Sequence, residues 1–591
     1  MRPSAFRSSK YFLCAFISGT ILWSSCKKDA PKNDPVTYGN SFVLTINKDK
    51  AVYKPGETVQ FSINRPLTGN LKLRYRHLME TISEAPFTGN SWSWTAPAAD
   101  FTGYLVDIYE TVDGEEKIHA STGIDVSSSW AKFPRYGFLS KYGQLTDAEI
   151  KAVMDNLTRH HINGLQFYDW QYKHHMPLAG SPSAPQAVWK DLSNRDVYLS
   201  TLRSYIDAAH KSGMQAMFYN LAFGALSDAA ADGVQEDWYV FKDQNHTTKD
   251  KHPLPLNFFK SDIYLTDAGN TNWQQYIAAK HNDVYQALDF DGFHIDQLGD
   301  RGALYTYNGT ALNQAATFKP FIQAMKAASP NKKLLMNAVN QYGQQNQIAT
   351  APVDFLYTEV WGPNDEYSHL SNIILNNNSY SSNTKPTVLA AYMNYNKADQ
   401  AGYFNTPGVL LADAVIFAFG GSHLELGEHM LGKEYFPNNN LLMPDELRNA
   451  IVGYYDFMVA YENLLRDGGN FNAPVVNCTN GKASINNWPP AKGEVSVIGK
   501  EFANRQVLHL VNFSNANSLE WRDSNGTQAK PSLIGNMDLT VNTAKAVKKV
   551  WLASPDINNG VATALEFTQT GNAVSLTVPS LQYWNMIVLE F

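Results

Sequence analysis

Two acidic residues stand at the ends of apolar segments of the kind that form buried β-strands. Asp296 ends the run Gly-Phe-His-Ile-Asp, and Glu359 ends the run Phe-Leu-Tyr-Thr-Glu. Burying a polar group without a partner costs roughly 2–7 kcal/mol, and burying a charge costs more, so something must offset that cost. Paired carboxylates can act as a nucleophile or base and as a proton donor with a raised pKa, which is what glycoside hydrolysis requires. A carboxylate at a strand end can also cap a helix or form an ion pair, so the interpretation depends on the pair.

A wider set of polar and aromatic residues lies near the ends of the predicted strands. Alternate side chains of a strand face the same way, so Asp296 shares a face with His294, and Glu359 shares one with Trp361. We predict that these neighbours and similar residues bind substrate: His294, Trp361, Asp169, Trp170, Tyr172, Asn220, Asn394, His423 and Glu425. The alternative for each is packing within the protein. Asp300 is predicted to orient Asp296 or to cap the next helix.

Neither a metal nor a cofactor is predicted. The adjacent His174 and His175 tend to point apart, and no third ligand follows at a spacing that suits a metal. The formal net charge is −7 and no Lys- or Arg-rich stripe appears, so the sequence offers no footprint for nucleic acid. Aromatic residues make up 13% of the chain, which suits either large cores or stacking on sugar rings. A neutral substrate fits this balance.

The elements that must hold these residues alternate between short apolar strands and amphipathic helical segments from about 129 to 469. The predicted strands are Tyr136–Lys141, Gly164–Trp170, Met214–Leu221, Gly292–Leu298, Lys333–Val339, Phe355–Trp361, Thr387–Asn394 and Gly421–Leu426. The helical segments include Thr146–Leu157, Tyr198–Ser212, Ala311–Ala328 and Asp445–Val459. Eight strand–helix repeats predict a (β/α)8 TIM barrel, whose active site lies at the carboxyl ends of the strands. An open doubly wound sheet is the alternative, but no Gly-x-Gly-x-x-Gly turn follows the first strand.

Segments of two-residue periodicity flank the predicted barrel. From 41 to 128, short alternating strands such as Val59–Ile63 are separated by turn residues, which indicates an immunoglobulin-like β-sandwich. From 470 to 591 the alternation returns, for example in Val507–Phe513, and predicts a second β-sandwich. The predicted fold is therefore multidomain α/β plus β, with the candidate catalytic residues in the central barrel at 129–469.

The first residues read as an export signal. Basic residues precede the apolar run Tyr11–Trp23, which is too short to span a bilayer comfortably and is followed by Ser-Ser-Cys26. We predict a lipoprotein signal peptide at 1–25, lipidation of Cys26 and a tether at 26–40. The protein would then be exported and anchored by its lipid alone to the bacterial outer membrane, on the periplasmic face or at the cell surface. A plain secretory signal is the alternative, because Trp23 stands where a lipobox has a small or branched residue.

The motifs around the two carboxylates resemble those of glycoside hydrolase family 66. Asp-Gly-Phe-His-Ile-Asp-Gln-Leu-Gly-Asp at 291–300 and Tyr-Thr-Glu-Val-Trp at 357–361 are similar to the two active-site strands of this family. The order of the predicted domains is also that of the family, which contains dextranases and cycloisomaltooligosaccharide glucanotransferases. The resemblance implies a retaining mechanism on α-1,6-linked glucan, with Asp296 as nucleophile and Glu359 as general acid/base.

The activity expected from this resemblance is hydrolysis of dextran within the chain, giving isomaltooligosaccharides. A cycloisomaltooligosaccharide glucanotransferase is an alternative, although cyclising relatives carry a large carbohydrate-binding insertion in the barrel, whereas the longest insertion here runs from Ala222 to Asn270. A non-catalytic surface glycan-binding lipoprotein is another, but a binding protein has no need for a paired acid and nucleophile. A third is an α-glycosidase for another neutral polysaccharide, because linkage specificity depends on loops.

Overall fold

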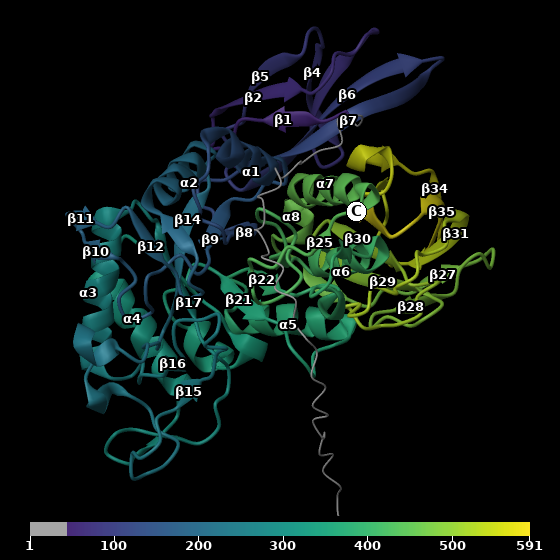
Figure 1. Ribbon diagram of the computed structural model, residues 1–591. Helices are drawn as coiled ribbons and strands as arrows, with labels where there is room; N and C mark the ends of the chain where they lie inside the picture. The colour runs from purple at the N-terminus through teal and green to yellow at the C-terminus, as the bar shows by residue number, and fades with distance from the viewer. Residues whose placement is uncertain (1–43) are drawn as a thin grey trace, which may run out of the picture. The chain divides into compact units, whose positions relative to one another are not determined.

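The computed structural model describes residues 44–591, drawn as ribbons in Figure 1. The predicted signal peptide, Cys26 and the tether lie outside the described residues. Within 44–591, no helix combines the length and the apolar character needed to cross a membrane. Strands and helices alternate in the middle of the chain, and strands dominate towards both ends. The protein therefore has a multidomain α/β fold.

All eight strands predicted for the middle of the chain are present, and each is parallel to its neighbours. They are β8 (Tyr136–Leu139), β9 (Gly164–Phe167), β14 (Gln215–Leu221), β17 (Gly292–Asp296), β20 (Lys333–Met336), β21 (Leu356–Glu359), β22 (Thr387–Ala390) and β24 (Ser422–His423). Five form a sheet in the order β20-β17-β14-β9-β8, and three form another in the order β21-β22-β24. A parallel bridge pairs Asn337 after β20 with Tyr357 on β21. At the opposite edge, the N–H of Phe138 on β8 donates to the carbonyl of Leu426 after β24 at 3.1 Å.

Helices follow these strands, and α6 (Thr406–Ala418) is buried on all sides. They are α1 (Asp147–Arg159), α2 (Leu199–Lys211), α3 (Thr271–Ala287), α4 (Phe318–Ala328), α5 (Tyr367–Tyr380), α6 (Thr406–Ala418), α7 (Asp445–Ala460) and α8 (Glu462–Leu465). In α1, Thr146 and Glu149 form a capping box, and the side chains buried at helical spacing include Ile150 and Leu157. The helix predicted from Ala311 is shorter than expected, because β19 (Ala311–Leu312) pairs with β18 (Leu304–Tyr305) and the helix begins at Phe318.

Two insertions add short strands next to the carboxyl ends of the central strands. The segment after β9 contains β10 (Gly180–Ser181), β11 (Ala184–Pro185), β12 (Val188–Lys190) and β13 (Asp196–Tyr198). The predicted insertion after β14 contains β15 (Lys251–His252) paired with β16 (Ile263–Tyr264). Further along, β23 (Gly402–Tyr403) pairs with β25 (Leu441–Leu442).

Two antiparallel sheets precede the central strands, and we call them the N-terminal sheets. One has the order β1-β2-β5 and the other β4-β3-β6-β7. Their strands are β1 (Ile46–Lys48), β2 (Thr58–Ile63), β3 (Lys72–His77), β4 (Glu80–Pro86), β5 (Ser91–Thr95), β6 (Thr102–Val112) and β7 (Glu115–Val126). Phe61 of the first sheet and Val106 of the second belong to one buried cluster, so the two sheets share a core.

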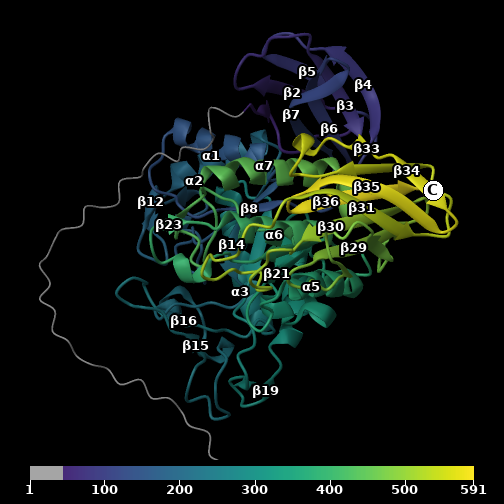
Figure 2. The ribbon, with the colours of Figure 1, turned by 90° about the vertical axis from the view of Figure 1, so that its right-hand side faces the viewer.

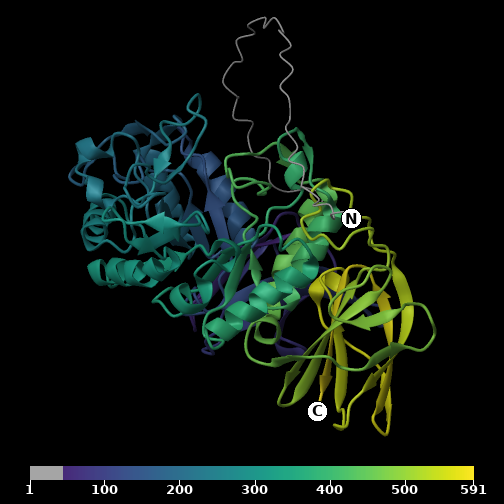
Figure 3. The same cartoon turned by 90° about the horizontal axis from the view of Figure 1, so that it is seen from below.

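Two further sheets follow the central strands, and we call them the C-terminal sheets; Figure 3 shows their strands in light green and yellow. The larger contains β26 (Asn470–Asn472), β28 (Ile485–Asn487), β29 (Val495–Phe502), β30 (Arg505–Asn512), β32 (Lys549–Ala553), β33 (Thr563–Ala564) and β36 (Trp584–Glu590). The smaller contains β27 (Val476–Cys478), β31 (Ile534–Asn542), β34 (Phe567–Thr570) and β35 (Ala573–Leu581). Leu510 and Ile587 pack with Leu539 and Val578 in one core between the sheets.

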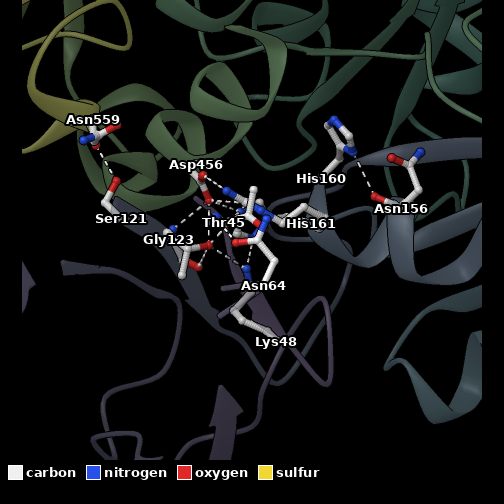
Figure 4. Close-up of polar contacts among 12 residues, drawn as sticks. Thr45, Lys48, Asn64, Ser121, Gly123, Asn156, His160, His161, Asp456 and Asn559 are labelled. Atoms are coloured by element: carbon white, nitrogen blue, oxygen red, sulfur yellow. Dashed lines mark hydrogen bonds and ion pairs between the residues drawn. The ribbon is translucent and has the colours of Figure 1, made fainter. Parts of the chain in front are cut away.

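A buried polar cluster joins the N-terminal sheets to the central helices. Figure 2 shows β7 beside α7, and Figure 4 shows Asp456 of α7 at the centre of the cluster. Its carboxylate accepts from the hydroxyl of Thr122 at 2.7 Å and from the N–H of Gly123 at 2.9 Å, both on β7. It also accepts from the guanidinium of Arg159 at 2.6 Å and from the ring of His161 at 2.7 Å. One carboxylate therefore connects three parts of the chain.

Candidate active site

Asp296 and Glu359 lie at the carboxyl ends of β17 and β21, and Asn337 stands between them. Asn337 follows β20, which pairs with β17 and is bridged to β21. Its amide nitrogen Nδ2 donates to Oδ1 of Asp296 at 2.8 Å and to Oε2 of Glu359 at 2.9 Å. Its Oδ1 accepts from the backbone N–H of Glu359 at 3.2 Å. A single side chain therefore fixes the positions of both carboxylates.

The shared amide also limits the separation of the two carboxylates. The bonded oxygens of Asp296 and Glu359 can be no farther apart than the sum of the two distances to Asn337 Nδ2. That limit falls below the range of about 6.5–9.5 Å typical of inverting glycosidases and close to the value of about 5–5.5 Å typical of retaining ones. Spacings in this lower range are typical of glycosidases in which one carboxylate attacks the sugar directly.

Each carboxylate receives a tyrosine hydroxyl on its second oxygen. Tyr219, on β14, donates to Oδ2 of Asp296 at 2.7 Å. Tyr392, just after β22, donates to Oε1 of Glu359 at 2.7 Å. Both carboxylates are partly exposed, while both tyrosines are buried. These two hydrogen bonds offset the cost of placing a charge at the otherwise apolar end of the sheet.

The two carboxyl groups differ in what surrounds them. Burial raises the pKa of Glu359 to about 7, and the nearby charge of Asp296 adds to the rise, against hydrogen bonds from Tyr392, Asn337 and Trp361. Burial also raises the pKa of Asp296, which the donors Asn337 and Tyr219 lower. A carboxyl group that is protonated near neutral pH beside a carboxylate held by two donors is the arrangement of an acid next to a nucleophile.

His294 lies two residues before Asp296 on β17 and is buried. Its side chain is 1% exposed, stacks on Tyr136 and meets the ring of Tyr357 edge-on. Its Nδ1 lies 3.2 Å from the hydroxyl of Tyr136, and burial lowers its pKa to about 3, so the ring is neutral. The predicted role in substrate binding is therefore replaced by one in supporting the strand that carries Asp296.

Three other predicted binding residues have different relations to the carboxylates. Asp169 interacts electrostatically with Asp296, and burial raises its pKa to about 7 against the opposing charge of Arg195. Trp361 is half-buried, hydrogen-bonds Glu359 and packs on Tyr392 with ring centroids 5.4 Å apart. The half-buried ring of Tyr172 instead packs under the ammonium of Lys260 at 4.3 Å. Asp169 and Trp361 thus interact with the carboxylate pair, whereas Tyr172 packs on Lys260.

Three predicted binding residues are structural. Trp170 is fully buried and packs against Phe218 and Phe290. Asn220 is fully buried and bonds both the ring and the carbonyl of His174. Asn394 is fully buried and donates to the carbonyl of Asp523, between β30 and β31, at 2.7 Å. These side chains have their polar atoms engaged within the protein or lie in its core.

His423 and Glu425 face the helices rather than the cleft. Leu424, between them, packs in another direction, in a buried cluster with Phe355 and Val388 of the central strands. His423 contacts Asp413 of α6 at 2.9 Å and the carbonyl of Ala391 at 2.8 Å, and Glu425 accepts from Tyr455 of α7 at 3.0 Å. Their exposure is 1% each, so the predicted contact with substrate is not made.

Asp300 does not hold Asp296. Its exposed carboxylate accepts the N–H of Gly302 at 2.8 Å and closes a local turn. Orientation of Asp296 is instead achieved by Tyr219 and Asn337. The predicted capping of a helix by Asp300 is also absent among residues 44–591, because β18 and β19 come before α4.

Two groups of side chains within the described chain have ligand atoms close enough for a metal ion. The first group is His175, Asp228 and Asp232. The ammonium of Lys173 contacts both of its carboxylates, at 2.7 and 2.6 Å, and so occupies the place that a metal cation would take. The second group is Asp413, His423 and Glu425, fully buried behind β24. Burial raises the pKa of Glu425 to about 8, and the charge of the neighbouring Asp413 adds to the rise.

Sequence reasoning missed Tyr219, Asn337 and Tyr392, the three residues that hold the carboxylates. All three lie at the carboxyl ends of strands that were predicted correctly. Asn337 breaks the apolar run Leu-Leu-Met of β20, which is a signal that sequence reading could have used. The two tyrosines gave no such signal, because tyrosine is common in strands for packing alone.

These features define a class of protein. Parallel strands that deliver two closely spaced carboxyl groups, one set up as an acid, belong to an enzyme that breaks or exchanges glycosidic bonds. The family model described as glycosyl hydrolase family 66 matches residues 48–588. The chain belongs to that family, which confirms the prediction from the two motifs.

Individual relatives carry two activities in their names. The chain is 28% identical over 724 residues to a cycloisomaltooligosaccharide glucanotransferase of Niallia circulans, covering 95% of this chain and 73% of the relative. It is 24% identical over 574 residues to a dextranase of Streptococcus salivarius, covering 83% and 67%. The crystal structure of a Paenibacillus cycloisomaltooligosaccharide glucanotransferase complexed with cycloisomaltoheptaose superposes with a TM-score of 0.85 at 27% identity, covering 92% of this chain and 100% of that one.

Proposed function

We propose that this protein is a retaining endo-dextranase that hydrolyses α-1,6-glucosidic linkages, with Asp296 as nucleophile and Glu359 as general acid/base. The observation that carries the proposal is the amide of Asn337, which donates to both carboxylates and keeps them at the spacing of a retaining pair. Family membership supports the reaction class, and the dextranase among the relatives supports the linkage.

The proposed reaction has two steps through a covalent intermediate. Protonated Glu359 donates to the leaving glycosidic oxygen while Asp296 attacks the anomeric carbon from the opposite face. Glu359, now ionised, then takes a proton from water, and the water oxygen displaces Asp296 from the glucosyl carbon. Tyr219 and Asn337 hold the nucleophile during both steps. Asp169 and Trp361 are proposed to bind glucosyl hydroxyls and the sugar ring at the cleft.

The architecture that we propose for this activity is a (β/α)8 barrel at 129–469 between two β-sandwiches. The bridge at one edge of the five-stranded sheet and the backbone hydrogen bond at the other support closure of the strands into a barrel. The shared cores of the N-terminal and C-terminal sheets support the sandwiches. We also propose export and lipidation at Cys26, on the sequence motif alone.

A second candidate activity is formation of cyclic isomaltooligosaccharides. The relatives with the higher identities are glucanotransferases, and this favours attack on the glucosyl-enzyme by a sugar hydroxyl instead of water. However, the alignment with one such relative runs over 724 residues, more than the 591 of this chain, so that relative contains segments that this chain lacks. The alignment with the dextranase runs over 574 residues and covers 83% of this chain, so the segments that this chain lacks are shorter in that relative. Hydrolysis therefore remains the first proposal.

The test is incubation of dextran with the protein that starts after Cys26, beside Asp296→Asn and Glu359→Gln. We expect linear isomaltooligosaccharides from the wild type and a loss of at least about 10²-fold in kcat for both variants. The matched control is Asp300→Asn, an exposed carboxylate that bonds only locally, which should retain activity. Mass spectrometry separates the candidates, because a cyclic product is lighter by one water than a linear one. Mainly cyclic products would contradict the proposed hydrolysis. No turnover of dextran would contradict the proposed substrate.

A further inference from the structure

A loop from the C-terminal sheets is built into the ends of the central strands. This loop, residues 519–524, lies between β30 and β31. Trp521 is fully buried, and its indole N–H donates to the carbonyl of Asn364 at 2.6 Å. The carbonyl of Arg522 accepts the N–H of Asn394 at 2.9 Å. The loop therefore bridges the segment that follows β21, which ends at Glu359, and the segment that follows β22, which contains Tyr392.

Arg522 lies at the centre of these contacts. Its Nη2 donates to the carbonyl of Val360 at 2.8 Å, and its Nη1 donates to the carbonyl of Tyr392 at 3.2 Å. Val360 directly follows Glu359, and Tyr392 provides the hydroxyl that Glu359 accepts. The guanidinium also lies over the ring of Trp361, at 5.2 Å from its centroid. Every one of these partners is next to Glu359 or bonded to it.

The surroundings of Arg522 are unusual for an arginine. The residue is 6% exposed, and among residues 44–591 its guanidinium contacts carbonyls and aromatic faces, while the carboxylates of Asp365 and Glu520 attract its charge from beyond ion-pair distance. A buried charge without an ionic partner is costly, so its presence calls for a reason beyond stability. Arginine is suited to the task because its planar fork can donate to two carbonyls at once, whereas a lysine ammonium is a compact, flexible point charge.

We propose that Arg522 is a positioning residue for the acid/base Glu359: by tying the carbonyls of Val360 and Tyr392 together, it keeps the Tyr392 hydroxyl on Oε1 of Glu359. This inference rests on the proposed role of Glu359. It makes the C-terminal sheets part of the catalytic machinery, since they supply the arginine. Asp523 holds the loop from the other side, with its carboxylate accepting from Asn405 at 2.7 Å.

The experiment compares Arg522→Met and Arg522→Lys with the wild type and with a matched control, Arg505→Met. Arg505 lies on β30 in the same sheets, and among the side chains of residues 44–591 it bonds only its neighbour Asn504. Two substrates are used: an isomaltooligosaccharide, whose leaving sugar needs a proton, and isomaltosyl fluoride, whose fluoride leaves without one. For Arg522→Met we expect kcat/KM, which reports the step in which the leaving group departs, to fall about 100-fold on the oligosaccharide and less than about fivefold on the fluoride. Arg522→Lys should fall between Arg522→Met and the wild type.

The pH profile gives a readout that reduced folding would not change. The hydroxyl of Tyr392 lowers the pKa of Glu359, so losing that hydrogen bond raises the pKa. The alkaline limb of kcat/KM should therefore move to higher pH in Arg522→Met and stay in place in Arg505→Met. Equal losses of kcat/KM on both substrates in Arg522→Met, or an alkaline limb that does not move, would contradict the proposed role of Arg522. If Arg522→Met does not fold, the same comparisons are made with Arg522→Lys.

A crystal structure of the Arg522 variant tests the positioning independently of turnover. We expect the contact between the Tyr392 hydroxyl and Glu359 Oε1, 2.7 Å in the wild type, to be broken. If it is retained, the inference is wrong even where activity falls. If it is broken but the wild type does not act on either substrate, the positioning stands and the proposed glucan substrate is what fails.

Discussion

At the scale of single residues, Asn337 is the side chain on which the geometry of the carboxylate pair depends. Replacing it with alanine removes one donor from Asp296 and one from Glu359, together with the acceptor of the Glu359 N–H. We expect kcat/KM on dextran to fall about 100-fold in Asn337→Ala, because the two carboxylates repel each other and lose their alignment. Asn346→Ala, at an exposed position after the same strand, is the control. A loss of less than about threefold in Asn337→Ala would contradict the role of the amide.

The pH dependence of activity also belongs to single residues. Glu359 must be protonated to act as an acid, and its pKa is raised to about 7, so kcat/KM should decline as the pH rises through about 7. Asp296 must be ionised, and its raised pKa places the acid limb above the usual range of an aspartate. Tyr392→Phe removes a donor that lowers the pKa of Glu359, so its alkaline limb should lie higher. The control is Tyr395→Phe, whose hydroxyl bonds Glu434. An unmoved limb in Tyr392→Phe would contradict the assignment of that limb to Glu359.

At the scale of elements, the strands could be predicted but the direction of their side chains often could not. Each central strand is a short apolar run bounded by polar residues, so its position is readable. Such strands are apolar on both faces, however, and the alternation that shows which face is inside is missing. His423 and Glu425 were therefore placed in the cleft although they contact the helices α6 and α7. The prediction that Trp170 binds substrate was wrong for another reason. The strand β9 ends at Phe167, and Asp169 has a φ of 48°, so the alternation of side chains along a strand no longer applies at Trp170.

The same reasoning explains which site residues were found. Asp296 and Glu359 are conspicuous because a carboxylate in an apolar strand is costly, and this cost is visible in sequence. Tyr219 and Tyr392 are not conspicuous, since their rings are compatible with packing and their donor role depends on strands far apart in the chain. Arg522 lies 163 residues beyond Glu359, in a loop of another part of the fold, and only the assembled structure brings it to the acid.

At the scale of the whole molecule, the central strands, the N-terminal sheets and the C-terminal sheets are held together by buried contacts. One apolar cluster includes Leu105 of β6, Phe457 of α7 and Trp584 of β36, so side chains of all three parts pack in a continuous core. Phe457 and Trp584 meet edge-on with centroids 4.8 Å apart. The helix α7 therefore contacts both flanking sets of sheets. A destabilising substitution in α7 should lower the stability of the whole described chain.

Asp456 on α7 is the residue where this coupling can be measured. Burial acts to raise its pKa, but the charge of Arg159 and the hydrogen bonds from Arg159 and His161 hold that pKa well below the usual range. Asp456→Asn leaves Arg159 buried without its ionic partner, and we expect a loss of about 3–5 kcal/mol in the free energy of unfolding, measured by denaturant at neutral pH. The exposed pair of Asp155 with Lys151 on α1 supplies the control, and Asp155→Asn should cost less than about 1 kcal/mol.

Because the pKa of Asp456 is depressed in the folded state, the wild type's advantage in stability is complete above the ordinary aspartate pKa of 3.8 and is lost as the pH falls below it. The two proteins should therefore converge in stability in acid, and an advantage that grew on acidification would rule out Asp456 as an ionised link between the parts.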